Sequence, residues 1–240
     1  MGHLSSRRIV PVHEHLRDQV AHALRAALVA GELLPGMVYS APTLAAELGV
    51  SATPVREAML DLAKEGLVEA VRNKGFRVTE VTDRDLDEYT EIRELIEVPT
   101  IARVAAVASP ETLEELRPVA REIVTAARGH DLIAYVDADR RFHLALLALA
   151  GNGHLVHVVS DLRKRSRLYG LNRLDASGRL VDSAQEHIEL LDLILAGDVE
   201  GAQACMRRHL GHIRSLWADG REEAAPGTPP KGRAGGGRAG

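Results

Sequence analysis

The sequence is poor in cysteine, in aromatic residues and in long hydrophobic runs. Of its 240 residues, one is cysteine and 3% are aromatic. The single cysteine, Cys205, excludes an internal disulfide and favours a reducing compartment, so we expect a cytoplasmic protein. No apolar run reaches the roughly 18 residues of a membrane-spanning helix, and no signal peptide is recognisable at the start. We therefore expect no association with a membrane.

A strong excess of charge of one sign is also lacking. The formal net charge is −4, and the first 80 residues carry nine basic and nine acidic side chains. Residues 81–219 carry 17 basic and 23 acidic side chains. Because the chain has no overall positive field, any binding to nucleic acid must depend on a local cationic surface.

What is present predicts a mainly α protein with two domains. Residues 1–80 show three short helical patterns, over 12–31, 40–49 and 52–65, followed by a β-hairpin in LVEAVRNKGFRVTEV. Residues 83–219 show helical patterns alone, which predict an all-helical bundle of about six helices, one of them over 155–174. Residues 220–240 are rich in Gly, Ala, Pro and Arg and predict a disordered tail.

The stretch GVSATPVREAML, residues 49–60, has the spacing of a helix-turn-helix. Gly49 permits the tight turn, and Ser51 or Thr53 is expected to cap the second helix. Arg56 extends from the start of that helix, where it can reach a phosphate or a guanine edge. The alternative interpretation is that Arg56 is a solvated helix residue without a DNA contact. The following hairpin has a cationic tip, so the whole unit is a winged helix that predicts binding to double-stranded DNA. The expected DNA-binding residues are Ser51, Thr53, Arg56, Arg72, Lys74 and Gly75.

The second domain places polar residues where its helices should bury apolar ones. Asp139 and His143 are four residues apart and share one helix face, and His187 and His209 interrupt the apolar stripes of two later helices. Burying unpaired carboxylates or imidazoles is unfavourable, so we expect the four to converge on one cation. This donor set suits a divalent metal, Zn²⁺ foremost, with Ni²⁺ and Mn²⁺ as alternatives. The other interpretation is a set of separately hydrogen-bonded core histidines.

Arg93 lies beside the apolar stripe of the helix expected to begin near residue 83. It can bind an anionic effector through two hydrogen bonds. The alternative is a salt bridge to Glu97 or Glu94, and the sequence leaves both open. Cys205, one turn before His209, is expected to be a small core residue and not a ligand.

The stretch GVSATPVREAMLDLAKEGLVEAVRNKGFRV resembles the DNA-binding domain of the GntR family of bacterial transcription factors. The resemblance is close over residues 16–81, and the bundle more loosely resembles the FCD domain of the FadR-like branch to about residue 217. It implies a ligand-responsive regulator, expected to be a repressor, that binds a palindromic DNA operator as a homodimer. The chain departs from the family at Ala52, often Arg, and at Ala41 and Pro42, often an acidic-basic pair. Operator sequences therefore do not transfer from relatives.

Metal-binding members of this branch carry Asp-x-x-x-His followed by two single histidines, which here are Asp139, His143, His187 and His209. On an octahedral ion, four protein ligands leave two positions for water or for a small organic acid effector. A metal-dependent hydrolase or lyase using the same residues is the rival hypothesis. Four ligands exceed the usual three of catalytic zinc sites, and the stripes offer no obvious carboxylate base, so a regulator and not an enzyme is predicted.

Overall fold

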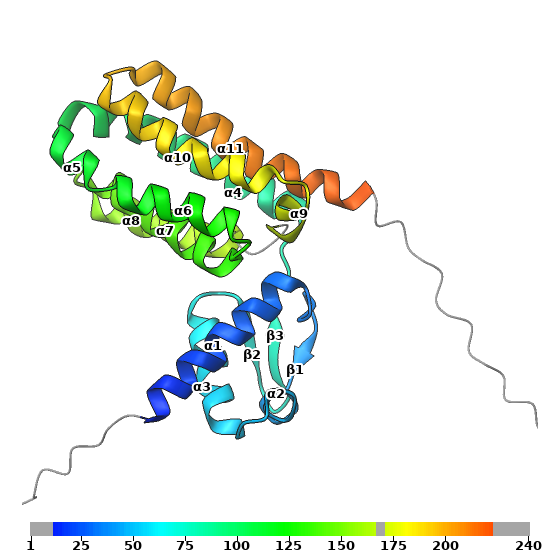
Figure 1. Ribbon diagram of the computed structural model, residues 1–240. Helices are drawn as coiled ribbons and strands as arrows, with labels where there is room; N and C mark the ends of the chain where they lie inside the picture. The colour runs from blue at the N-terminus through cyan, green and yellow to red at the C-terminus, as the bar shows by residue number, and fades with distance from the viewer. Residues whose placement is uncertain (1–11, 167–170, 223–240) are drawn as a thin grey trace, which may run out of the picture.

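The computed structural model describes residues 12–166 and 171–222, which form a small winged-helix domain and a larger helical domain (Figure 1). The first contains α1 (Val12–Ala30), β1 (Val38–Tyr39), α2 (Ala41–Leu48), α3 (Ala52–Lys64), β2 (Val68–Val71) and β3 (Gly75–Val78). The second contains α4 (Asp83–Val107), α5 (Pro110–Glu114), α6 (Arg117–Arg128), α7 (Leu132–Ala148), α8 (Gly153–Ser166), α9 (Leu171–Ala176), α10 (Arg179–Leu195) and α11 (Val199–Glu222).

Local signals set the ends of the helices in the winged-helix domain. Ser40 accepts a hydrogen bond from the Thr43 amide at 3.2 Å and so begins α2. Gly49 ends the same helix in the left-handed conformation, with φ of 67°. The core of the domain is apolar and is formed by α1, α3 and the sheet. Its buried residues include Leu24, Leu44, Val55, Met59, Leu62, Val68, Phe76 and Val78.

The predicted hairpin forms one side of a three-stranded antiparallel sheet with strand order β1-β3-β2. Val68 pairs with Val78 across β2 and β3, and Asn73 makes the turn with φ of 60°. The sequence patterns had not predicted β1, which has two residues and pairs Tyr39 with Phe76. Leu48, the last residue of α2, is 38% exposed and lies outside the core, although its apolar side chain four residues after Leu44 would favour burial.

The helical domain has six longer helices, with α5 and α9 as short additions within the described part of the chain. Thr82 begins α4 through a capping box with Asp85. The single helix expected over 155–174 is instead α8 and α9, with residues 167–170 outside the described ranges. The helix α11 continues to Glu222, beyond the predicted start of the tail, and residues 223–240 lie outside the description.

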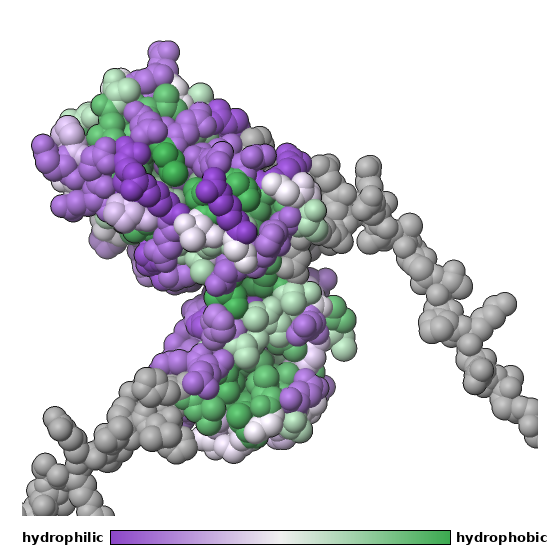
Figure 2. All heavy atoms as spheres, in the orientation of Figure 1, coloured by the Kyte–Doolittle hydropathy of each residue, from purple (hydrophilic) through white to green (hydrophobic). Residues whose placement is uncertain are grey.

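The two domains contact each other through α1, which packs against α7 and α9. Figure 1 shows the chain passing from the winged helix directly into α4. In Figure 2 the visible face of the bundle is mostly hydrophilic, whereas the winged-helix domain shows more hydrophobic surface. Among the described residues, no helix is long and apolar enough to span a membrane.

Candidate nucleic-acid interface and metal centre

The N-terminal end of α3 is an exposed polar surface above a buried apolar face. Val55 and Met59 are buried, while Ser51, Thr53 and Arg56 are exposed. The expected capping is wrong in detail: Ser51 has the backbone conformation of an N-cap but makes no side-chain capping bond, and Thr53 lies within the helix. The amides of the first turn are therefore not satisfied by that hydroxyl, and an anion can bind there.

The tip of the hairpin presents Arg72 and Lys74 to solvent. Gly75, predicted to bind DNA, has a structural requirement of its own. Its φ is +132°, and a Cβ at this position would overlap the carbonyl oxygen of Tyr39. Only glycine allows β1 to approach β3 this closely. The tight turn therefore serves the sheet as well as the exposed tip.

The four predicted metal ligands meet in the helical domain. One donor atom each from Asp139, His143, His187 and His209 lies within 4.8 Å of the other three, and all four residues are buried. The Nε2 atom of His143 lies 3.0 Å from that of His187 and 3.2 Å from that of His209. The Oδ1 atom of Asp139 lies 3.2 Å from the Nε2 of His187. The interpretation as separate core histidines is therefore wrong in geometry, since the side chains converge.

The outer nitrogens of two of these imidazoles are held by hydrogen bonds. The Nδ1 of His187 lies 3.0 Å from the carbonyl oxygen of Ala184, and the Nδ1 of His209 lies 2.9 Å from Oε2 of Glu186. A carbonyl or carboxylate accepts a proton from Nδ1, which leaves the lone pair on Nε2 facing the other ligands. The two inward lone pairs of His187 and His209 lie beside the Asp139 carboxylate, and they repel it unless a cation or a shared proton lies among them. The donor set and its orientation thus fit a divalent metal ion.

The third imidazole, His143, is oriented differently. Its Nδ1 is buried without a hydrogen-bond partner among the described residues, and the nearest carboxylate oxygen, Oε2 of Glu97, is 3.9 Å away. Burial lowers the pKa of His143 well below its usual value, and the positive charge of Arg163 lowers it further. Burial also lowers the pKa of His209 to about 4, although Glu186 opposes this shift. Both rings are therefore neutral near pH 7, which is the form that binds a metal.

A network of buried charges lies directly behind the four predicted ligands. Glu97 accepts hydrogen bonds from Arg93 at 2.7 Å and from Arg163 at 2.7 Å, and Arg163 also donates to Oδ2 of Asp139 at 3.2 Å. Burial alone would raise the pKa of Glu97, but Arg163 and Arg93 hold it at about 2. Burial would likewise raise the pKa of Asp139, but His143 and Arg163 hold it well below its usual value. Both carboxylates are therefore ionised.

The structure thus settles the partner of Arg93 as Glu97, one of the two predicted carboxylates. Arg163 and Glu186 are functional candidates that the sequence patterns did not single out. Arg163 follows buried Val159 by four residues, a signal that it shares the inward face of α8. Two carboxylates, Glu97 and Glu186, lie near the four residues, but each is held by an arginine, so neither contradicts the expectation of no obvious carboxylate base. Cys205 is buried as expected.

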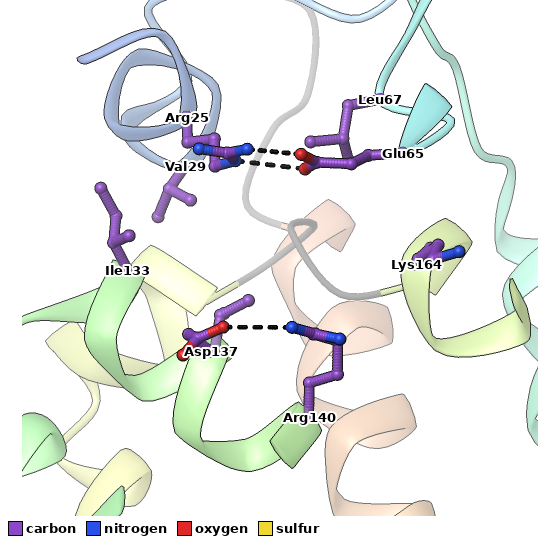
Figure 3. Close-up of a pocket in the computed structure, with 9 residues that line it drawn as sticks. Arg25, Val29, Glu65, Leu67, Ile133, Asp137, Arg140 and Lys164 are labelled. Atoms are coloured by element: carbon purple, nitrogen blue, oxygen red, sulfur yellow. Dashed lines mark hydrogen bonds and ion pairs between the residues drawn. The ribbon is translucent and has the colours of Figure 1, made fainter. Parts of the chain in front are cut away.

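A cavity of about 410 Å³ lies between the two domains (Figure 3). Arg25 on α1 forms an ion pair with Glu65, which follows α3, on one side of it. On the other side, Arg140 lies 3.4 Å from Asp137, and both come from α7. The remaining lining residues are Val29, Leu67, Ile133, Val136 and Lys164. The helix that supplies two metal-ligand candidates therefore also faces the winged-helix domain.

Comparison with known proteins agrees with this architecture. Residues 16–78 match the family of bacterial regulatory proteins named gntR, and residues 88–212 match the FCD domain. The transcriptional regulator McbR of Escherichia coli is 31% identical over 198 residues, covering 81% of this chain and 89% of McbR. A probable D-xylose utilization operon repressor of Paenarthrobacter nicotinovorans is 30% identical over 193 residues, covering 80% and 84%. The solved structure of E. coli McbR/YncC covers 86% of this chain and 98% of its own, with a TM-score of 0.65 and 28% identity.

A winged helix joined to a separate helical bundle defines a DNA-binding transcription regulator, a class that comprises regulators and not enzymes. Within that class, the chain belongs to the GntR family, in the FadR-like branch that carries an FCD domain.

Proposed function

We propose that this regulator is a homodimeric, cytoplasmic repressor whose helical domain binds a divalent metal ion and a small carboxylate effector. The observation that carries the proposal is the convergence of Asp139, His143, His187 and His209 from three helices. A polar cluster at the centre of a bundle costs stability unless it binds something. The attached winged helix gives such binding a consequence, because a ligand that favours one conformer shifts the affinity for DNA.

The proposed DNA contacts come from two elements. The exposed Arg56 and the amides at the start of α3 would enter the major groove, with Ser51 and Thr53 beside them. Arg72 and Lys74 at the hairpin tip would contact the neighbouring backbone or groove. Gly75 supports this tip through its close approach to Tyr39.

The proposed metal ligands are the three Nε2 atoms and the Asp139 carboxylate. Zn²⁺ suits a mixed set of imidazole and carboxylate ligands, as do Ni²⁺ and Mn²⁺. When bound, the ion would act as a Lewis acid that attracts a carboxylate oxygen. The protein's own part is to align the imidazoles of His187 and His209, through Ala184 and Glu186, and to keep those of His143 and His209 neutral through burial.

The charge balance behind the site favours an anionic effector. The positive charges of Arg93 and Arg163 offset the negative charges of Glu97 and Asp139, so a divalent ion adds two uncompensated positive charges. In addition, Nη2 of Arg93 and Nε of Arg163 are buried without a hydrogen-bond partner among the described residues. A carboxylate that reaches either of these donors would satisfy it. The xylose-operon relative is a probable repressor, which supports repression as the mode of action.

Titration of operator DNA with the Arg56→Ala variant tests the DNA-binding part. We expect a loss of about 1–3 kcal/mol in binding and a shallower dependence on salt, because a cation at the interface is removed. The control is Arg84→Ala, an exposed arginine paired with Glu88 outside the winged helix, which should bind as the wild type does. Equal affinity and equal salt slope for both variants would reject Arg56 as a contact.

Metal analysis of purified protein tests the second part. We expect about one equivalent of a divalent metal in the wild type and its loss in His187→Ala, because three donors bind it far less tightly than four. His157→Ala is the control, since this histidine is exposed and 3.6 Å from Asp161. Metal retained in the His187, His143 and His209 alanine variants would show that the cluster is not the binding site.

A further inference from the structure

The helix α4 has apolar side chains on two opposite faces. Val98, Ile101 and Val104 are buried in the core of the bundle. On the other side, Ile92 is 41% exposed and Leu95 is 70% exposed. Large apolar side chains that lie exposed on the outer face of a helix commonly mark a surface that binds a partner.

The outer apolar residues follow the spacing of a helix that packs against another helix. They recur at alternating intervals of three and four residues, which keeps them on one narrow stripe. This outer stripe consists of Ile92, Leu95, Pro99, Ala102 and Ala106. The side chains also change in size along the stripe: the first half contributes Ile and Leu, and the second half contributes Ala.

The charges beside the stripe identify a second copy of this chain as the partner. Glu91 and Glu94 flank its first half and Arg103 flanks its second half. Glu91 and Arg103 are exposed, Glu94 is half-buried, and none of the three forms an ion pair in the described part of the chain. If two copies of α4 pack antiparallel about a twofold axis between Val98 and Pro99, Glu94 of each copy lies opposite Arg103 of the other. The same register places Leu95 opposite Ala102. Such a self-complementary arrangement is what a twofold interface requires.

The neighbouring surface has a shape that suits this arrangement. A groove of about 360 Å³ runs between α4 and α11. It is lined by Leu95 and Pro99 on α4 and by Gln203 and Arg207 on α11. The amide of Gln203 donates to the carbonyl oxygen of Val98 at 3.2 Å and holds the two helices together at the proposed axis. The large apolar side chains of the partner's stripe would lie along this groove.

We propose that the outer stripe of α4, together with the groove beside α11, is the interface of the homodimer, with the two α4 helices antiparallel. This inference rests on the proposed function, which requires a dimer, and adds the surface and its register. The C-terminal segment 223–240 is a weaker candidate for the same surface, because its sequence contains no large apolar residue.

Charge reversal tests the register. Glu94→Arg and Arg103→Glu should each weaken the dimer at least about 10-fold in sedimentation velocity, because each places two pairs of like charges at the interface. The double variant, Glu94→Arg with Arg103→Glu, restores opposite charges in both pairs and should return the dissociation constant to within about threefold of the wild type. Glu115→Arg, at an exposed glutamate outside α4, is the control and should remain dimeric.

The outcomes separate the interface from the function. Unfolding of a variant is detected by circular dichroism and by loss of bound metal, and rescue by the double variant excludes it as the cause. A dimeric wild type whose single variants stay fully dimeric overturns the interface but leaves the dimeric regulator intact. A wild type that remains monomeric, with or without metal, overturns both. Dimerisation that disappears when residues 223–240 are removed assigns the surface to that segment and also overturns the proposal.

Discussion

At the scale of single residues, the buried charges of the bundle are best explained as supports for the four proposed ligands. Glu186 is the clearest case, because it reaches Nδ1 of His209 at 2.9 Å and Nε of Arg208 at 3.1 Å. A carboxylate behind a metal-bound histidine fixes the ring and makes it a better ligand. Glu189 also binds Arg208, at 2.7 Å, but the structure shows no bond from it to a ligand.

This difference between two neighbouring glutamates gives a matched pair of variants. We expect Glu186→Ala to weaken metal binding about 10- to 100-fold, the usual effect of removing a group that supports a ligand. Glu189→Ala should leave metal affinity unchanged, although it removes a carboxylate from the same arginine. Competition with a chelator of known affinity measures both. Equal affinities for the two variants would show that Glu186 does not support the metal site.

The sequence predicted that Asp139, His143, His187 and His209 converge, but it did not predict the charges behind them, for a physical reason. A histidine or aspartate on an apolar stripe is conspicuous, because the stripe itself indicates burial. Arg163 stands in the polar run DLRKRSR, where an inward arginine has the same appearance as a solvated one. Its burial depends on Glu97, which is 66 positions away, and periodicity within one helix contains no information about such a partner.

At the scale of elements, short-range signals predicted most of the winged helix, and contacts between elements determined the rest. The Ser40 cap and Gly49 predicted α2 and the turn before α3, and the alternation of apolar and polar residues predicted the hairpin. The strand β1 has only two residues, and it exists because β3 offers a free edge to Tyr39. No pattern within two residues can indicate a strand, so this pairing could not be predicted from the sequence.

The pairing of β1 with β3 makes Gly75 the most demanding position of the wing. We expect Gly75→Ala to destabilise the winged-helix domain by about 1–3 kcal/mol through backbone strain, with the clash against Tyr39 adding to this. Amide hydrogen exchange should accelerate at Val78, whose N–H donates to Met37 at 2.9 Å. Gly153→Ala is the control, because no atom lies within 4 Å of a Cβ there. Unchanged exchange in β3 would mean that the sheet tolerates a side chain at this turn.

At the scale of the whole molecule, α7 connects the proposed metal site with the winged helix. One face of α7 carries Asp139 and His143, and another carries Asp137 and Arg140 at the cavity between the domains (Figure 3). Across that cavity, the hydrogen bond with Glu65 is the largest cause that raises the pKa of Arg25, and the negative charge of Asp137 raises it further. A shift of α7 on metal or effector binding would therefore change the electrostatic contact with α1.

This arrangement predicts that the coupling between metal and DNA depends on Asp137. We expect Asp137→Ala to retain metal, because its side chain is not among the ligands, but to bring the ratio of operator affinities with and without metal closer to one. Mutations in a coupling element typically change the coupling by about 0.5–2 kcal/mol, which corresponds to roughly 2- to 30-fold. Asp137 and Glu122 both form ion pairs with Arg141, but only Asp137 lines the cavity. Glu122→Ala is therefore the matched control. If both variants keep the wild-type ratio, the coupling does not pass through this face of α7. The route to test is then α4, because this helix follows the winged helix directly in the chain.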